Sequence, residues 1–249
     1  MPMNIPPPFT ANSALSTTLK TMGYAVLDQA NALELVACTA KEADVWLPSW
    51  NDLPPDAYLK DGGHYRYRRH SCFVVMGEYV QQTAHRAHWQ PLEYNALHGG
   101  MQRMFQAMLP EITQSPAWTK LLSKLGGLCT VLKPETTTWF VEAHQFRIDT
   151  TDGIGRPTPE GAHRDGVDFV AVMLVNRQSI KGGETRVFDV KGPAGQRFTM
   201  TEPWTLLLLD DERVIHESTP IQPLDTEGSE ASYRDTLVLT FRANAFQGE

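Results

Sequence analysis

Residues 161–175 read GAHRDGVDFVAVMLV, a turn-forming segment that leads into an apolar run of strand length. His163 and Asp165 are two positions apart, and on extended backbone the side chains at i and i+2 leave the same face. An imidazole and a carboxylate placed in this way can occupy adjacent positions on one metal ion. The spacing alone is weak evidence, because a pair in a surface loop has the same pattern.

Short apolar runs recur through the second half of the chain, starting near Thr137. They are separated by clusters of Gly, Pro and Asp, and they occupy residues 138–149, 167–175, 185–190, 204–210 and 234–243. Several short strands with turn signals between them predict a β-sandwich or barrel. The sequence therefore predicts a mainly β core in this half.

The first half of the chain has helical spacings of apolar residues instead. Tyr94, Leu97, Met101, Met104 and Met108 predict a helix over 94–108 that packs on the core, and a further helix over 115–125 should end at Gly126-Gly127. We expect a single domain over residues 1–249. In it, residues 1–130 form a helical support region and residues 131–249 form the β core.

Composition and charge limit the function classes. The 249 residues are 41% hydrophobic and 20% charged, as in an ordinary globular protein. The net charge of −7 argues against a nucleic-acid partner, which needs a basic face. No apolar run approaches the ~20 residues that span a bilayer, and the Pro-rich start lacks a signal-peptide pattern. The three cysteines, without a CxxC pair, indicate reduced thiols and a cytoplasmic protein with no membrane partner.

A second histidine, His216, follows the predicted strand 204–209 and the turn 210–213. Two histidines and one carboxylate make the facial triad of non-haem Fe(II) oxygenases, which leaves three metal positions for a chelating co-substrate and O₂. The alternative for His216 is a loop-end histidine with a satisfied hydrogen bond.

The last strong strand has an unusual polar face. Arg234 and Thr236 share this face by the period of two, together with Val238, Thr240 and Arg242. A guanidinium fork and a hydroxyl suit a carboxylate, which Arg can bind through two parallel hydrogen bonds. The pattern predicts the wall of an anion pocket, and an edge strand with solvated arginines is the alternative.

In this order, the segments resemble the Fe(II)/2-oxoglutarate-dependent dioxygenases. The matching motifs are His163-Arg-Asp165, Gly182-Gly183-Glu184-Thr185, LLLLDDERVIHESTP at 206–220 with His216, and Arg234-Asp-Thr236. The sequence is most similar to a bacterial subgroup that includes free L-amino-acid hydroxylases of the isoleucine-hydroxylase type, through HQFRI at 144–148 and HRDGVDF at 163–169. The resemblance covers residues 138–243.

This resemblance implies a double-stranded β-helix core, a jelly-roll of the cupin-like kind, with supporting helices. It implies that His163, Asp165 and His216 bind Fe(II), and that Arg234 with Thr236 holds the distal carboxylate of 2-oxoglutarate. Residues 221–232 look like an inserted loop between His216 and this arginine, so Arg242 remains an alternative anchor. The implied reaction uses O₂, hydroxylates a free L-amino acid or similar small molecule, and releases succinate and CO₂. Ascorbate is the expected reductant in vitro.

Candidate substrate-binding residues are Arg68, in the basic and aromatic segment 65–70, and Gln145, Arg147 and Asp168 near the metal motif. We expect a monomer or a homodimer with a small-molecule substrate. Two other function classes remain open at this point. One is a cupin-like metalloenzyme of another kind, such as an isomerase or a zinc hydrolase. The other is a non-catalytic protein that binds a metal or 2-oxoglutarate and regulates a stress or biofilm response.

Overall fold

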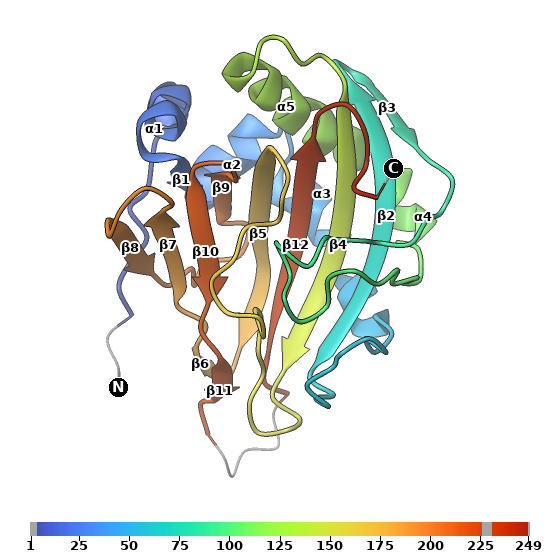
Figure 1. Cartoon of the computed structure of the whole chain (residues 1–249), viewed down its shortest axis with the longest axis vertical. Helices are drawn as coiled ribbons and strands as arrows, with labels where there is room; N and C mark the ends of the chain where they lie inside the picture. Colours follow the sequence, from blue (N-terminus) through green and yellow to red (C-terminus); the bar gives the residue numbers. More distant parts are fainter. Residues whose placement is uncertain (1–3, 226–230, 249) are drawn as a thin grey trace.

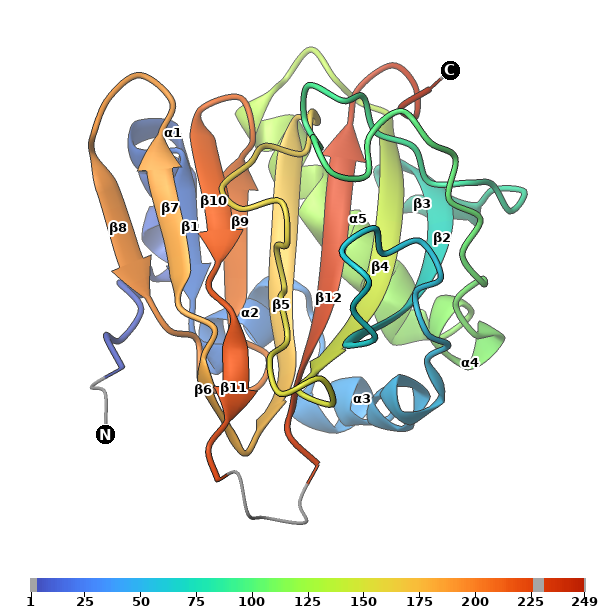
Figure 2. The same cartoon turned by 60° about the horizontal axis from the view of Figure 1, so that its bottom comes forward.

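The computed structural model describes residues 4–225 and 231–248 as antiparallel sheets with helices on one side (Figure 1). The largest sheet has the strand order β1-β9-β5-β12-β4-β2-β3. A smaller sheet has the order β10-β7-β8, and β11 pairs with β6. Figures 1 and 2 show α1, α2, α3 and α5 behind the large sheet, on the side away from β7, β8 and β10. The predicted mainly β fold with a jelly-roll core and supporting helices is confirmed.

The strands have the following bounds: β1 Tyr24–Leu27, β2 Arg66–Met76, β3 Tyr79–Gln82, β4 Trp139–Asp149, β5 Phe169–Gln178, β6 Ile180–Gly182, β7 Thr185–Asp189, β8 Gly195–Phe198, β9 Leu206–Asp210, β10 Val214–Ser218, β11 Ile221–Pro223 and β12 Tyr233–Arg242. The helices are α1 Leu15–Met22, α2 Gln29–Leu35, α3 Ala40–Asp44, α4 Pro110–Thr113 and α5 Pro116–Leu132, with 3-10 turns at Asn12–Ala14 and Leu47–Asp52.

Two hydrophobic cores lie on the two faces of the large sheet. On β5, Ala171 and Met173 belong to the core under the helices, whereas Val170 and Leu174 belong to a second core between the two sheets. Strands buried on both faces read as continuous apolar runs, which explains the uninterrupted sequence FVAVMLV at 169–175. The sheet is therefore fixed on both sides, and the space between the sheets is left for polar side chains farther along β12, β4 and β2.

The strand β12 shows the predicted alternation. Leu237, Leu239 and Phe241 lie in the helix-side core, while Arg234 and Thr236 line a cavity on the other face. Its neighbours β4 and β5 pair with it along almost its whole length, with one irregularity between Asp235 and Thr236 on the β5 side. The polar face predicted from the period of two is thus buried between the sheets.

Several predictions for the first half were wrong. Residues 94–108 form turns and loop, not a helix. The loop is held by side chains, because Asn95 accepts a hydrogen bond from the backbone N–H of His98 (2.7 Å), and Gly100 has a positive φ of 74°. The spacing of methionines did not reflect core packing, since Met104 is 54% exposed.

The helix α5 continues past Gly126-Gly127 to Leu132, so these glycines do not end it. A Cβ on Gly126 would lie 2.8 Å from Cγ1 of Val75, so this glycine allows the helix to approach β2 closely. Residues 1–130 also contribute three strands to the large sheet, and among them β2 spans 11 residues. The region expected to be a helical support is therefore partly sheet.

The expected inserted loop at 221–232 contains the short strand β11, and its residues 226–230 lie outside the described part of the chain. Among the described residues, no helix is both long and apolar enough to cross a membrane.

Candidate active site

His163 and His216 lie directly opposite each other between a loop and β10. Their backbones form an isolated antiparallel bridge, in which each N–H donates to the carbonyl oxygen of the other residue at 3.0 and 2.9 Å. This pairing places the two imidazole rings side by side, with centroids 4.7 Å apart. Residues separated by 53 positions are thus brought into contact by two backbone hydrogen bonds.

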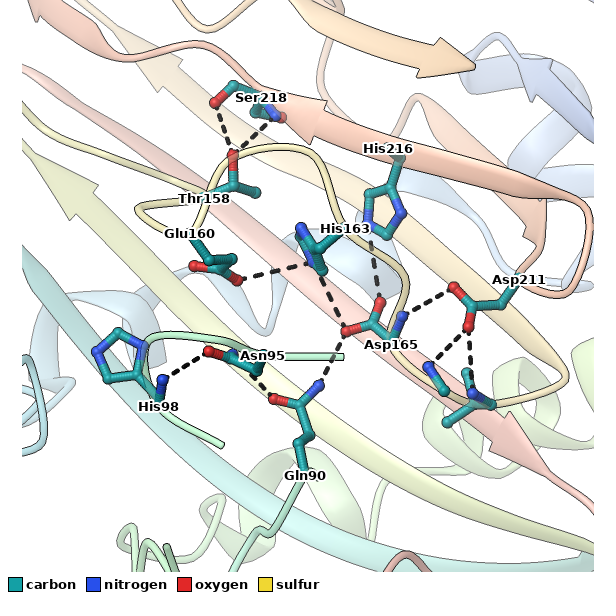
Figure 3. Close-up of polar contacts among 12 residues, drawn as sticks. Gln90, Asn95, His98, Thr158, Glu160, His163, Asp165, Asp211, His216 and Ser218 are labelled. Atoms are coloured by element: carbon teal, nitrogen blue, oxygen red, sulfur yellow. Dashed lines mark hydrogen bonds and ion pairs between the residues drawn. The ribbon is translucent and has the colours of Figure 1, made fainter. Parts of the chain in front are cut away.

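Asp165 completes a group of three possible metal ligands (Figure 3). Its Oδ1 lies 3.8 Å from Nε2 of His163, and its Oδ2 lies 3.7 Å from Nε2 of His216. These separations are too long for hydrogen bonds. They suit donors to one ion, since two metal–ligand bonds of about 2.1 Å span up to ~4.2 Å.

The loop that carries Asp165 is held by a buried carboxylate. Asp211 accepts hydrogen bonds from the backbone N–H groups of Asp165 (3.0 Å), Gly166 (2.8 Å) and Val167 (3.2 Å). Gly166 has a φ of 75°, a conformation that favours glycine, and a Cβ there would lie 2.4 Å from the ring of Tyr94. The sequence HRDG therefore turns at its glycine and is fixed by an aspartate 46 residues later.

The surroundings of the two histidines set their protonation and so affect metal binding. His163 donates from Nδ1 to the carbonyl oxygen of Gly161 at 2.9 Å, which leaves the lone pair of Nε2 facing the other ligands. Burial lowers the pKa of His216 well below its usual value, so its ring is neutral at pH 7. Burial opposes a proton on His163, but the carboxylates of Asp165 and Glu160 outweigh it and raise the pKa of this ring, so a metal ion would have to displace that proton. Two imidazoles and one carboxylate on one side of an ion are the ligand set that non-haem Fe(II) enzymes use.

These side chains open onto a cavity of about 130 Å³ between the two sheets. A volume of this size has room for on the order of ten water molecules. Its walls contain apolar side chains from β5, β12 and the loop before β5, namely Val172, Val238 and Val167. They also contain polar and charged side chains from β2, β4, the loop 88–103 and the loop before β5: Arg66, Arg68, Glu142, His88, Gln90, Arg103 and Glu160. The cavity therefore suits a small molecule with both polar and aliphatic parts.

At the lower end of the cavity, β12 presents Arg234 and Thr236, each 4% exposed. Arg234 stands in register with Arg177 of β5. Burial, and the charge of Arg177, lower the pKa of Arg234 to about 10, so its guanidinium is still charged at pH 7. No described carboxylate forms an ion pair with Arg234, and Nη1 of Arg177 is buried with no hydrogen-bond partner. Two neighbouring buried cations in this state form a site for an anion.

Arg242 lies outside this cavity. Its Nη1 donates to the carbonyl oxygens of Ala245 (2.8 Å) and Phe246 (3.0 Å), so it stabilises the turn after β12. The structure places Arg234, and not Arg242, in the same cavity as the three ligand candidates.

Of the four candidate substrate residues, only Arg68 lines the cavity. Gln145 lies on the opposite face of β4 and donates to Oγ of Ser49, and Arg147 forms a two-point ion pair with Asp235 at 2.8 and 2.7 Å. The period of two predicts that Gln145 and Arg147 share a face, but it does not tell which face meets the cavity. Asp168 binds Lys133 and the backbone N–H of Ala243, so it ties α5 to the end of β12.

A second group of four buried side chains is close enough to hold a metal: His70, His88, Glu142 and His144. Its geometry favours hydrogen bonds instead. Oε2 of Glu142 accepts from Nδ1 of His88 at 2.5 Å and from Nε2 of His70 at 3.0 Å, both within hydrogen-bonding range. Arg68 donates to Nδ1 of His144 at 2.7 Å, so the neutral ring carries its proton on Nε2 and has no lone pair left for a metal.

Sequence reasoning missed most of this polar wall. Glu142, His144 and Phe146 line the cavity from alternate positions of β4, and on β2 only Arg68, which Arg66 joins in the wall, was a predicted site residue. For β4, the alternation of side chains along a predicted strand was the signal that could have identified these cavity residues. Gln90, Arg103 and Glu160 come from loops, where no periodicity marks them.

Comparison with known proteins shows the family to which the chain belongs. A family model described as 2OG-Fe dioxygenase matches residues 47–240. The chain is 25% identical over 181 residues to an L-isoleucine-4-hydroxylase from Bacillus thuringiensis, covering 70% of this chain and 72% of that protein.

Among solved structures, a bsmA homolog from Methylobium petroleophilum PM1 has a TM-score of 0.91 and 51% identity, with 96% of each chain covered. IDO from Bacillus thuringiensis has a TM-score of 0.73 and 16% identity, covering 94% of this chain and 99% of that one, so it supports the fold alone. The family match favours a dioxygenase over the isomerase, zinc hydrolase and non-catalytic alternatives.

The buried histidine network predicts a loss of stability in acid. Burial lowers the pKa of His88 to about 4, so between pH 6.5 and 4 the unfolded chain binds a proton that the folded chain does not. This residue should therefore cost about 2 kcal/mol of unfolding free energy between pH 7.5 and pH 5. Urea unfolding at several pH values should show a weaker loss for H88Q than for the unsubstituted protein. The same substitution at the exposed His64 is the control, and an unchanged acid loss in H88Q would assign it to other groups.

Proposed function

The chain belongs to the 2OG-Fe dioxygenase family, whose members use Fe(II) and 2-oxoglutarate, and we propose that it hydroxylates a free L-amino acid or a similar small molecule. The observation that carries this proposal is the small cavity between the sheets, which joins the His163, Asp165 and His216 group to a wall that bears both positive and negative side chains. The similarity to an L-isoleucine-4-hydroxylase supports an amino acid as the substrate.

We propose that His163, Asp165 and His216 hold the iron. Their donor atoms converge, and the carboxylate is also fixed from outside the group, because Gln90 donates to its Oδ1 at 3.2 Å. Gln247 donates to the backbone carbonyls of Asp165 and Gly166 at 2.8 and 2.7 Å. The three side chains fill one side of an ion and leave its other side toward the cavity.

We propose that Arg234 binds the distal carboxylate of 2-oxoglutarate, with the hydroxyl of Thr236 beside it. The neighbouring buried guanidinium of Arg177 adds positive charge at this end of the cavity, and its own position is fixed by the carbonyl oxygens of Ile180 and Gly182. A buried arginine without a protein carboxylate needs an anion from outside the chain, and a fork of parallel N–H groups selects a planar carboxylate.

When bound, the iron and 2-oxoglutarate supply the oxidation: 2-oxoglutarate and O₂ become succinate and CO₂, and one oxygen atom enters the substrate. The chain supplies positions and a dry site. Asp211 holds the loop that carries Asp165 through its hydrogen bond to Gly166, and the valines on β5 and β12 exclude water. Arg68 is stacked between Phe105 and Phe146, at 3.8 and 4.3 Å from their ring centroids, and forms part of the wall that faces the substrate.

The first experiment is a reaction prepared without oxygen and started with air. It contains the protein, Fe(II), 2-oxoglutarate, ascorbate and a panel of the twenty free L-amino acids, and mass spectrometry follows succinate and oxygen added to any amino acid. We expect a hydroxylated aliphatic amino acid and an equal amount of succinate. Succinate above the protein-free control, with no hydroxylated amino acid, would contradict the proposed substrate class.

Removing one ligand should remove the metal. H163A should lower the affinity for Fe(II) by more than about 100-fold, because a loss of this order follows even from changes to residues that only support metal ligands. Anaerobic metal titration measures this directly, without turnover. H64A, at an exposed histidine, should bind Fe(II) normally. Stoichiometric Fe(II) binding by H163A would exclude His163 from the site.

Loss of the guanidinium at position 234 should act on 2-oxoglutarate alone. R234A should raise the KM for 2-oxoglutarate by at least about 30-fold, since removing one partner of a buried charge pair costs 2 kcal/mol or more. The matched variant R242A should leave this KM unchanged. The reverse result, a raised KM in R242A and a normal one in R234A, would move the anchor to Arg242.

A further inference from the structure

Two loops place groups of opposite charge on the wall of the cavity, and each group has a buried polar atom without a hydrogen-bond partner. Arg103 lies in the loop that follows β3, and Glu160 lies three residues before His163. Both line the same cavity as the proposed iron ligands. No ion pair joins these two described residues, although each charge would be stabilised by the other.

Arg103 is only 2% exposed. Its Nη2 donates to Oε1 of Gln90 at 3.0 Å, a neutral acceptor, and its Nε is buried with no partner. Burial is the main cause that lowers the pKa of Arg103 to about 10, which still leaves the guanidinium charged at pH 7. A buried cation with a free N–H and no carboxylate is costly unless an anion arrives to bind it.

Glu160 is an anion that also lacks a hydrogen-bond partner at one of its oxygens. Its side chain is 11% exposed, and its Oε2 is buried without a hydrogen-bond partner. Its other oxygen, Oε1, lies 3.7 Å from Nε2 of His163, and Figure 3 shows the carboxylate turned toward this histidine. The free oxygen is therefore an acceptor next to the proposed metal position.

Apart from Arg234, the other charged groups of this part of the wall have partners within the chain. Arg66 and Arg68 both pair with the carboxylate of Asp56, although Nη2 of Arg66 and Nε of Arg68 are buried without a hydrogen-bond partner. Arg66 donates to Oδ2 of Asp56 at 2.8 Å, and Arg68 donates to His144 between two aromatic rings. Glu142 accepts two hydrogen bonds from histidines. Arg103 and Glu160 are the pair of opposite charges that this network does not satisfy.

We propose that Arg103 binds the α-carboxylate and Glu160 the α-ammonium of the substrate, so that the site selects a free zwitterionic amino acid. This assignment rests on the proposed amino-acid hydroxylase function. The guanidinium fork matches a carboxylate, and a carboxylate oxygen accepts from an ammonium group. A peptide bond at either end of the amino acid would remove one of these charges, so peptides and N-acylated amino acids are excluded.

The same contacts connect the substrate to the metal position. Gln90 accepts from Arg103 through Oε1 and donates through Nε2 to Oδ1 of Asp165. A single amide group thus separates the carboxylate-binding guanidinium from a proposed iron ligand. This connection fixes the distance between the bound amino acid's backbone and the metal, and with it the carbon of the side chain that is presented for oxidation.

The test compares charge analogues in matched variants. Calorimetry measures binding in the presence of Fe(II) and 2-oxoglutarate and without oxygen. The ligands are L-isoleucine and L-leucine, together with two kinds of analogue. The 2-hydroxy acids lack the ammonium group, and the α-amides lack the carboxylate. The unsubstituted protein should bind either amino acid at least about 30-fold more tightly than its analogues. E160Q should no longer bind the amino acid more tightly than the hydroxy acid, but should still prefer it to the amide. R103Q should show the reverse, with only the preference for the amino acid over the amide lost. A purely structural role would not produce this pattern.

Controls separate the assignment from the general function. E78Q and R197Q change exposed residues of the same types and should keep both preferences. R103K, which retains the charge, should still favour the amino acid over its amide if R103Q does not fold. Amino-acid binding with both preferences intact in E160Q and R103Q, or loss of the preference over the amide in R103K, would overturn the assignment and leave the proposed function standing. If neither L-isoleucine nor L-leucine binds, the same calorimetry is extended to the other eighteen free amino acids, and failure of all twenty to bind the unsubstituted protein would contradict both.

Discussion

The carboxylate of Asp211 accepts hydrogen bonds from three consecutive backbone N–H groups, and the position of Asp165 depends on it. Asp211 is fully buried, and burial together with the charge of Asp165 raises its pKa to about 7. Such a carboxylate is stable inside a protein only when its hydrogen bonds are satisfied. Here the backbone N–H groups of Asp165, Gly166 and Val167 provide these hydrogen bonds. The bridge between His163 and His216 then sets these two proposed ligands against each other, so backbone geometry determines the positions of all three proposed ligands.

The buried charges of this protein fall into two groups. Arg66 with Asp56, and Arg147 with Asp235, are paired at 2.7–2.8 Å within the chain. Arg234, Arg103 and Glu160 line the cavity, and neither arginine pairs with a described carboxylate. Because an uncompensated buried charge costs several kcal/mol, these three positions identify the groups that ligands must satisfy. Pairing, more than burial or residue type, separates structural charges from ligand-binding ones.

The sequence predicted the parts of the site that follow local rules. The alternation on β12 placed Arg234 and Thr236 on one face, and HRDG predicted a turn with its two ligand candidates adjacent. Other features depended on contacts between distant segments. Gly126 was interpreted as a helix end, although it allows contact with Val75 of a strand that was not predicted. Gln145 and Arg147 share a face, but only the packing of β4 between the cavity and the segment that carries Ser49 decides that this face points away from the cavity.

Under the proposed assignments, the arrangement of charges would also let two carboxylate-bearing ligands occupy one cavity without exchanging places. The end near Arg234 has a second guanidinium, from Arg177, and no described carboxylate in an ion pair with Arg234, so it favours a ligand with net negative charge. The region near Arg103 also holds Glu160, whose charge repels a dicarboxylate and attracts an ammonium group. A 2-oxoglutarate molecule turned toward Arg103 would bring a carboxylate against Glu160. An amino acid placed at Arg234 would leave its ammonium group beside two cations. Repulsion in each wrong arrangement adds to attraction in the right one, and this combination is how specificity between similar ligands is built.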